Sequence, residues 1–288
     1  MFWRCPGSAG WGKLSPSMSL RVEQLGSAEA DPIRSFLARE PLKNLHLLAV
    51  LEERARVEVH AAFAADQIAA LALVDPERGL VLPSAIGSAS DFSAIGEHLA
   101  SRVRLQKSVG EKSAVEALVK ALGKTELRTS HLHRLYWVSP DQLGPYLQPG
   151  LRVATESDLP QLLALAERAL TESLGSAPTA PELSILERET LENVRLQQSR
   201  VFEVEGQLVL KVEVSFRFSM GAELGGLYIA PEYRRRGYAT HALGHLSRQL
   251  LASLPLLTMR AADALAGVAR KVGYQSGPAM QLLVTDRK

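Results

Sequence analysis

The segment that most constrains the fold is 224–240, where an apolar run leads through a proline-bounded turn into a helix. Leu224 to Ile229 has the composition of a strand, and Pro231 follows it. After the turn, small and apolar residues recur at helical spacing, namely Ala239, Ala242, Leu243, Leu246 and Leu250. The pattern therefore places Arg234 to Gly237 at a helix N-terminus.

A helix N-terminus of this composition is suited to phosphate. Its first backbone N–H groups have no partner within the helix, and the positive end of the helix dipole points at the anion. Gly237 lets a ligand approach the backbone closely, and Ala239 keeps the next contact small. The consecutive guanidinium groups can neutralise a pyrophosphate and a further phosphate. The segment predicts a site for a multiply phosphorylated cofactor.

Taken alone, the run Arg234 to Arg236 is also typical of a solvated face or of a surface that meets nucleic acid. The order of strand, proline, glycine and helix favours the phosphate site. Lys and Arg number 33 against 31 Asp and Glu, so the net charge is only +2. This balance gives no general reason to bind nucleic acid or an anionic membrane, and we expect neither as a partner.

The same segment resembles the phosphate loop of the GCN5-related N-acetyltransferase (GNAT) family, Gln/Arg-x-x-Gly-x-Gly/Ala, through Arg234, Gly237 and Ala239. Flanking residues fit the family as well, namely Leu227, Ile229, Pro231 and the pair Gly273 and Tyr274. The resemblance covers Leu151 to about Val284. It implies an acyltransferase of the EC 2.3.1 class that moves an acetyl group from acetyl-coenzyme A to a primary amine.

By this resemblance, the pantetheine arm of the cofactor pairs with the strand backbone at Leu227 and Ile229. The pyrophosphate meets the amides from Arg235 to Thr240. The Ile229 amide stabilises the tetrahedral intermediate. The expected cofactor-binding residues are Leu227, Tyr228, Ile229, Arg234, Arg235, Arg236, Gly237, Tyr238, Ala239 and Thr240.

Glu223 is the candidate catalytic base, because some family members hold a glutamate six residues before the position of Ile229. A solvated charge at a strand end is the alternative interpretation. The helix position where many members carry an acidic tyrosine is Ala269, and Ala262 replaces the usual asparagine. A departing thiolate with a pKa of about 8.5 still leaves without full protonation. A non-catalytic acyl-coenzyme A binding or sensor module remains the alternative function.

The two halves of the chain open alike. Leu20-Arg21-Val22 precedes Asp31-Pro32, and Leu151-Arg152-Val153 precedes Asp158-Leu159-Pro160, where Ser157 is the expected helix cap. Three matching residues also arise by chance. Apolar strands are expected at Val57 to Leu73, Leu80 to Pro83, Val201 to Val204, Gln207 to Phe216, Leu224 to Ile229, Leu256 to Met259 and Met280 to Val284, with a helix over Asp263 to Val272.

We therefore predict an α/β (α+β mixed sheet) fold of tandem GNAT-like domains, each a central, mostly antiparallel sheet flanked by helices. The expected units are 20–140 and 151–288, joined by a linker over 141–150 that is rich in Pro and Gly. In the first unit, Leu82 to Ser88 stands where the phosphate loop belongs but has no arginine. We expect this unit to have lost the cofactor, to fold without it, and to wall the acceptor cleft of the second unit.

Other features bear on the setting of the protein. Cys5 is the only cysteine, which excludes an intrachain disulfide and favours a reducing, cytoplasmic compartment. Residues 1–19 have the composition of a flexible tail without a signal-peptide core, and Met18 is an alternative start. His241 and His245 lie one helical turn apart but lack the glutamate of a His-Glu-x-x-His zinc site, so no metal is expected. The expected partners are a small-molecule or peptide amine, in a monomer or homodimer.

Overall fold

The computed structural model describes residues 20–53, 57–123, 126–145 and 150–285. The tail expected over 1–19 and the end of the expected linker, 146–149, lie outside these residues. The part of the linker that is described contains a short 3-10 helix at Pro140–Gln142.

Both halves of the chain contain the same order of elements. The first half contains β1 (Arg21–Leu25), α1 (Ala30–Leu37), α2 (Pro41–Glu53), β2 (Glu58–Ala64), β3 (Gln67–Asp75), β4 (Leu80–Pro83), α3 (Ala89–Leu99), β5 (Lys107–Glu111), α4 (Lys112–Leu122) and β6 (Leu127–Val138). The second contains β7 (Leu151–Val153), α5 (Leu159–Leu174), α6 (Ala180–Arg195), β8 (Ser199–Val204), β9 (Gln207–Phe218), β10 (Gly221–Ile229), α7 (Tyr238–Leu251), β11 (Leu257–Ala261), α8 (Ala266–Val272) and β12 (Gln275–Thr285). The repeat therefore extends over each whole half, and the expected strands are confirmed. The stretch from Val57 is two strands, because Ala65 turns the chain at a φ of 53°.

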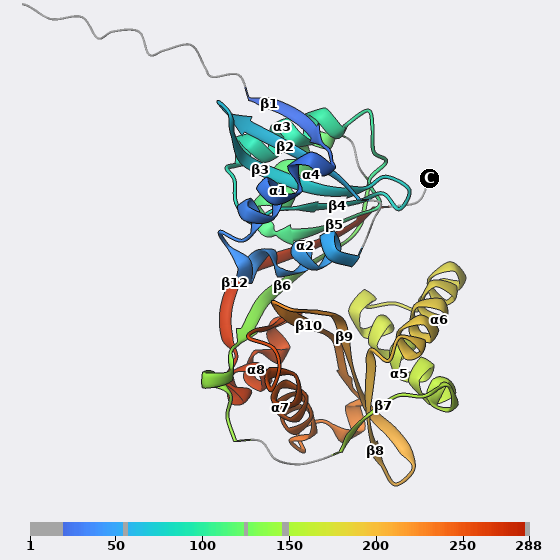
Figure 1. Ribbon diagram of the computed structural model, residues 1–288. Helices are drawn as coiled ribbons and strands as arrows, with labels where there is room; N and C mark the ends of the chain where they lie inside the picture. Colours follow the sequence, from blue (N-terminus) through green and yellow to red (C-terminus); the bar gives the residue numbers. More distant parts are fainter. Residues whose placement is uncertain (1–19, 54–56, 124–125, 146–149, 286–288) are drawn as a thin grey trace, which may run out of the picture.

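The strands of the described residues form one mixed sheet in the order β1-β2-β3-β4-β5-β12-β6-β11-β10-β9-β8-β7 (Figure 1). The last strand of each half is exchanged: β6 pairs with β11 of the second half, and β12 pairs with β5 of the first. These two strands also pair with each other at the centre of the sheet. The predicted fold class is confirmed, but the two units share one sheet.

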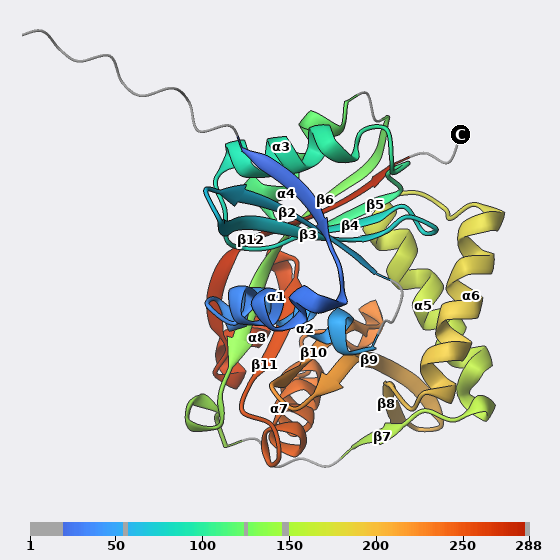
Figure 2. The same ribbon diagram turned by 45° about the horizontal axis from the view of Figure 1, so that its top comes forward.

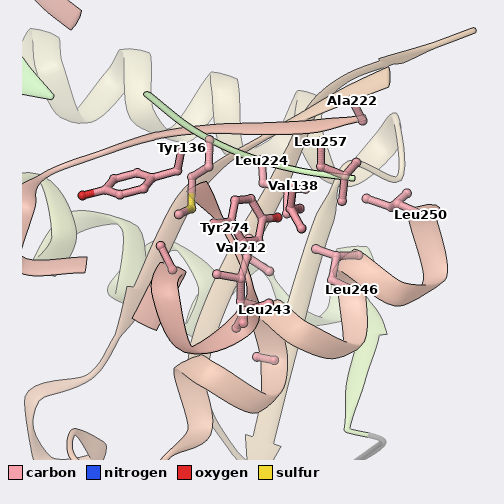
Figure 3. Close-up of a cluster of buried hydrophobic side chains, with 14 of the residues drawn as sticks. Tyr136, Val138, Val212, Ala222, Leu224, Leu243, Leu246, Leu250, Leu257 and Tyr274 are labelled. Carbon is pink, nitrogen blue, oxygen red and sulfur yellow. The ribbon is translucent and has the colours of Figure 1, made fainter. Parts of the chain in front are cut away.

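Helices cover both faces of this sheet. One face, which we call the α7 face, carries α3 and α4 over the first half and α7 and α8 over the second. The other, the α2 face, carries α1 and α2 over the first half and α5 and α6 over the second. Figure 3 shows Leu243, Leu246 and Leu250 of α7 packed beneath strands that carry Leu224, Val138 and Leu257.

The start of α5 differs in one detail from expectation. Thr155 rather than Ser157 caps the short 3-10 helix Glu156–Asp158 that leads into α5: the Asp158 carboxylate accepts hydrogen bonds from the Thr155 amide at 2.8 Å and from its hydroxyl at 3.0 Å. The Arg152 guanidinium donates to both oxygens of the same carboxylate, at 2.7 and 2.8 Å. Asp158 therefore joins β7 to the helix start, a role that a serine hydroxyl at the preceding position cannot fill.

Helix α2 reaches from the first half across to the second. Its Leu45 and Ala49 are buried against Phe216 of β9. Figure 2 shows α1 and α2 at the junction between the strands of the two halves. The first half thus covers part of the second half's α2 face.

His46 of α2 is buried at this junction, and only 7% of it is exposed. Burial, with the positive charge of Arg260 beside it, lowers the pKa of His46 to about 3. Because this folded-state pKa lies below the unfolded value, the stability contributed by neutral His46 is present above about pH 6.5 and is lost as the pH falls.

We expect the free energy of unfolding to fall by about 1.4 kcal/mol for each pH unit below 6.5 on account of this one group. Denaturant titrations at pH 7, 6, 5 and 4 measure this slope. His46→Leu should have a flatter dependence, because the group that must remain neutral is gone. An identical dependence in the variant and the parent would show that His46 does not contribute.

Candidate active site

The second half contains a split between two parallel strands. Ala222 to Leu224 of β10 pair with Leu257 to Met259 of β11, and the pairing ends there. The register of β10 against β9 then jumps from Gly225 to Tyr228, which is a β-bulge. Gly226 in the bulge has a φ of 57°, and a Cβ there would lie 2.8 Å from the Glu213 side chain. A side chain here would be strained by the backbone conformation and would displace the Glu213 side chain.

The bulge turns the end of β10 towards the split. The Ala230 amide donates to Val209 of β9 at 2.9 Å. Successive N–H groups alternate in direction along a strand, so the Ile229 amide points away from β9. It points to the edge of β10 that is no longer paired with β11. An extended ligand therefore has backbone to pair with at this end of β10.

The phosphate turn follows directly, after a short 3-10 helix at Pro231–Tyr233. Arg235 and Gly237 both have positive φ, 63° and 85°, so the turn curves into a concave nest of amides. Helix α7 begins at Tyr238 as expected, with no side-chain cap and no acidic residue in its first turn. Within the described residues, the amides from Arg235 to Thr240 have no hydrogen-bond partner. They are available to an anion.

The arginines of the turn have different surroundings. Arg234 donates to both carboxylate oxygens of Glu172 on α5, at 2.9 and 2.7 Å, and its Nε donates to the Ile229 carbonyl at 3.1 Å. Arg236 lies over the Tyr233 ring, 5.4 Å from its centroid, and Arg235 is exposed. Arg234 thus braces the turn against α5, and the other two guanidinium groups remain at its rim.

The other expected cofactor residues lie around this turn. The Tyr228 hydroxyl donates to Glu172 at 2.7 Å, and its ring packs in the core beneath α5. Leu227, Ile229 and Ala239 pack against the core of the α7 face. The Tyr238 ring lies 5.2 Å from that of Phe202. Leu227, Tyr228 and Ile229 therefore offer backbone rather than side chains to the split.

Glu172 was missed by the sequence analysis, because nothing in the pattern of α5 sets it apart from other exposed acids. Its hydrogen bonds from Arg234 and then from Tyr228 lower the pKa of its carboxyl group. The charged carboxylate ties β10, α5 and the phosphate turn together.

Glu223 is not a solvated strand-end charge, because only 5% of it is exposed. Its carboxylate accepts hydrogen bonds from the Nε of Arg260 on β11, at 3.2 Å, and from one terminal nitrogen of the same guanidinium. The ion pair lies on the α2 face, on the side that α2 of the first half covers. Ala269, at the expected tyrosine position, is fully buried in the core.

The corresponding turn of the first half is closed by its own side chains. Ser88 and Asp91 form a capping box, so a carboxylate lies at the start of α3 where a phosphate would need amides. The Ala85 amide donates to the Asn44 side chain at 2.8 Å. A Cβ at Gly87 would lie 2.6 Å from the Ala70 side chain, so space behind the turn is filled. These contacts support the expectation that this half has lost the cofactor.

Two further observations concern the described residues alone. No three or more His, Cys, Asp or Glu side chains are grouped so that they could hold a metal ion. The pair His241 and His245 on α7 is therefore not part of such a group. None of the described helices has both the length and the apolar composition that a membrane crossing requires.

Comparisons with known proteins agree with this geometry. Residues 168–274 match the model of the acetyltransferase (GNAT) family. A comparison with curated proteins found no match. Three solved structures share the fold over nearly the whole chain, and the first is a GNAT-family acetyltransferase from Colwellia psychrerythraea, 14% identical, covering 92% of this chain and 100% of its own with a TM-score of 0.55.

The second is a GCN5-related N-acetyltransferase from Sphaerobacter thermophilus, 14% identical, covering 93% and 95% of the two chains with a TM-score of 0.56. The third is a Drosophila protein, 13% identical, covering 92% and 98% with a TM-score of 0.59. These likenesses establish the fold, and the family match lies over α5 to α8, around the split and the phosphate turn. The second half of the chain therefore contains a domain of the GNAT acetyltransferase family, over residues 168–274.

Proposed function

We propose that this protein is an N-acetyltransferase, which moves the acetyl group of acetyl-coenzyme A to a primary amine by direct attack on the thioester. The uncapped N-terminus of α7 beside the split between β10 and β11 is the observation that carries the proposal. The amides from Arg235 to Thr240 would hold the pyrophosphate, with Arg235 and Arg236 at its rim. The pantetheine arm would run along the end of β10.

The Ile229 amide has the direction needed to stabilise a tetrahedral intermediate in the split, because its N–H points away from β9. The acceptor would approach over the α2 face, where α2 of the first half forms one wall. This arrangement supports a role for the first half in selecting a small-molecule or peptide amine.

The alternative is a non-catalytic module that binds acyl-coenzyme A. Ala269 in place of the usual tyrosine favours this alternative. The ion pair that holds the Glu223 carboxylate against Arg260 favours it too. Thiol release from acetyl-coenzyme A, measured over a panel of small amines, amino acids and peptides, distinguishes the two. We expect at least one amine to accelerate release. If acetyl-coenzyme A stabilises the protein but no amine accelerates thiol release, the binding module is favoured.

One coenzyme A should bind to each full-length chain, because the turn of the first half is closed by Ser88, Asp91 and Asn44. Isothermal titration calorimetry on the intact protein measures this stoichiometry. Two equivalent binding events per chain would contradict the assignment of a closed site to the first half.

A further inference from the structure

The α2 face next to the split carries a histidine that the second half does not supply. Directly paired residues on neighbouring strands point to the same face, and Arg260 pairs with Leu135 of β6. Glu223 and Arg260 share the α2 face through their ion pair. Because side chains alternate along a strand, His133 also lies on this face, two residues before Leu135. Half-buried, it remains open to a ligand.

His133 is level with the split rather than with the paired part of the strands. The last pair between β10 and β11 joins Leu224 to Met259, and Met259 pairs with Tyr136. His133 and Leu227 each lie three residues beyond that point, about 10 Å further along the sheet. Across the sheet, β6 is separated from β10 by β11 alone, which corresponds to about 10 Å between backbones. The acetyl group of a cofactor bound as proposed would lie between the two.

We infer that His133, brought by the exchanged strand β6 of the first half, accepts the proton of the acceptor amine. The inference rests on the proposed acetyl transfer. Glu223 is less suited to this step, because its carboxylate is buried and already accepts two hydrogen bonds from Arg260.

The surroundings of His133 favour its neutral imidazole over the charged form. Burial, the stacked ring of His131 at 6.2 Å and the charge of Arg260 all lower the pKa of His133. Glu111 of β5 lies on the same face at the level of His133, on the other side of β12, because both residues pair with Met280. His46 faces Arg260 from α2, and Glu223 faces it from β10. The Glu223 carboxylate is compensated by Arg260, and it lies four residues from the level of His133, because Glu223 pairs with Thr258 and Thr258 with Trp137.

The step balances as follows. The ammonium group gives one proton to the imidazole, and the neutral amine attacks the thioester carbonyl. The C–N bond forms, the C–S bond breaks, and the second proton of the nitrogen goes to the departing thiolate. The imidazolium releases its proton to water, so the products are an amide, a thiol and one proton.

The test uses the full-length protein with an amine accepted by the parent. His133→Gln should lower kcat/KM about 100-fold at pH 7 and much less at pH 9 or above, where the free amine is abundant. The matched variant is His131→Gln, which removes the neighbouring ring on the same face and should keep the low-pH limb, moved to higher pH because His131 no longer lowers the pKa of His133. Added imidazole should restore part of the activity of His133→Ala, which a purely structural role does not predict.

A profile of His133→Gln that matches the parent would overturn the inference, as would loss of the low-pH limb in Glu223→Gln but not in His133→Gln. A second readout does not need turnover: in NMR spectra of ring-labelled histidine, acetyl-coenzyme A should move the His133 resonance more than that of His131. An unmoved His133 resonance would also overturn the inference. If acetyl-coenzyme A moves the His133 resonance but the parent releases no thiol with any amine, the result counts against the proposed acetyl transfer instead.

Discussion

Replacement of Gly237 by valine is expected to abolish stabilisation of the protein by coenzyme A. Gly237 has a φ of 85°, which costs a residue with a Cβ about 1–2 kcal/mol, and a β-branched side chain more. Moving the turn also removes charge-assisted hydrogen bonds from its amides to phosphate, each worth about 1.5–3 kcal/mol. Affinity should fall at least about 100-fold. At a ligand concentration of 100 times the parent's Kd, stabilisation then drops from about 2.7 to about 0.4 kcal/mol.

Gly175→Val is the matched control, because Gly175 is also a positive-φ glycine at a helix end in the second half, with a φ of 68° and open space around it. It carries a similar backbone penalty without a phosphate site. Thermal unfolding with and without coenzyme A measures both variants. A Gly237→Val protein that coenzyme A stabilises as it does the parent would refute the assignment of the phosphate turn.

Glu223→Gln should destabilise the protein by about 3 kcal/mol, because it leaves the partly buried Arg260 guanidinium without its counter-charge. This loss is separate from any effect on turnover. The double variant Glu223→Leu with Arg260→Met should recover most of the stability, since an apolar pair removes the unpaired charge. Urea unfolding at neutral pH gives both values.

Glu156→Gln is the control for this pair. Glu156 forms an ion pair with Arg195 at 3.0 Å, and both side chains are 62% exposed, so its loss should cost less than about 1 kcal/mol. If both variants lose the same free energy of unfolding, the buried ion pair of Glu223 with Arg260 contributes no more to stability than the exposed pair of Glu156 with Arg195.

The phosphate turn could be predicted from the sequence because its determinants are local. Pro231, Gly237 and the apolar spacing of α7 fix the strand, turn and helix within one short segment. Strands β2 to β4 and β8 to β12 lie in stretches predicted from similarly local patterns of apolar residues, whereas β5 and β6 of the first half were not predicted. Glu223 could be singled out by its position on β10, but its burial could not.

The remaining site residues depend on contacts between distant segments. Arg260 meets Glu223 only because β10 and β11 are parallel neighbours, and Glu172 meets Arg234 only once α5 packs beside the turn. His133 is still more remote, because it lies in the other half and reaches the split through the exchange of β6. Periodicity within one segment carries no signal for such pairings.

The place of β12 has a consequence for synthesis on the ribosome. The hydroxyl of Thr285 donates to the carbonyl of Leu105, 180 residues away in the sequence. β12 lies between β5 and β6, so the first half cannot reach its final strand pairing until residue 285 has emerged. Contacts of such high sequence separation slow folding and leave strand edges open in the meantime. A nascent chain stalled before residue 275 should therefore keep β5 and β6 accessible to protease or chaperone.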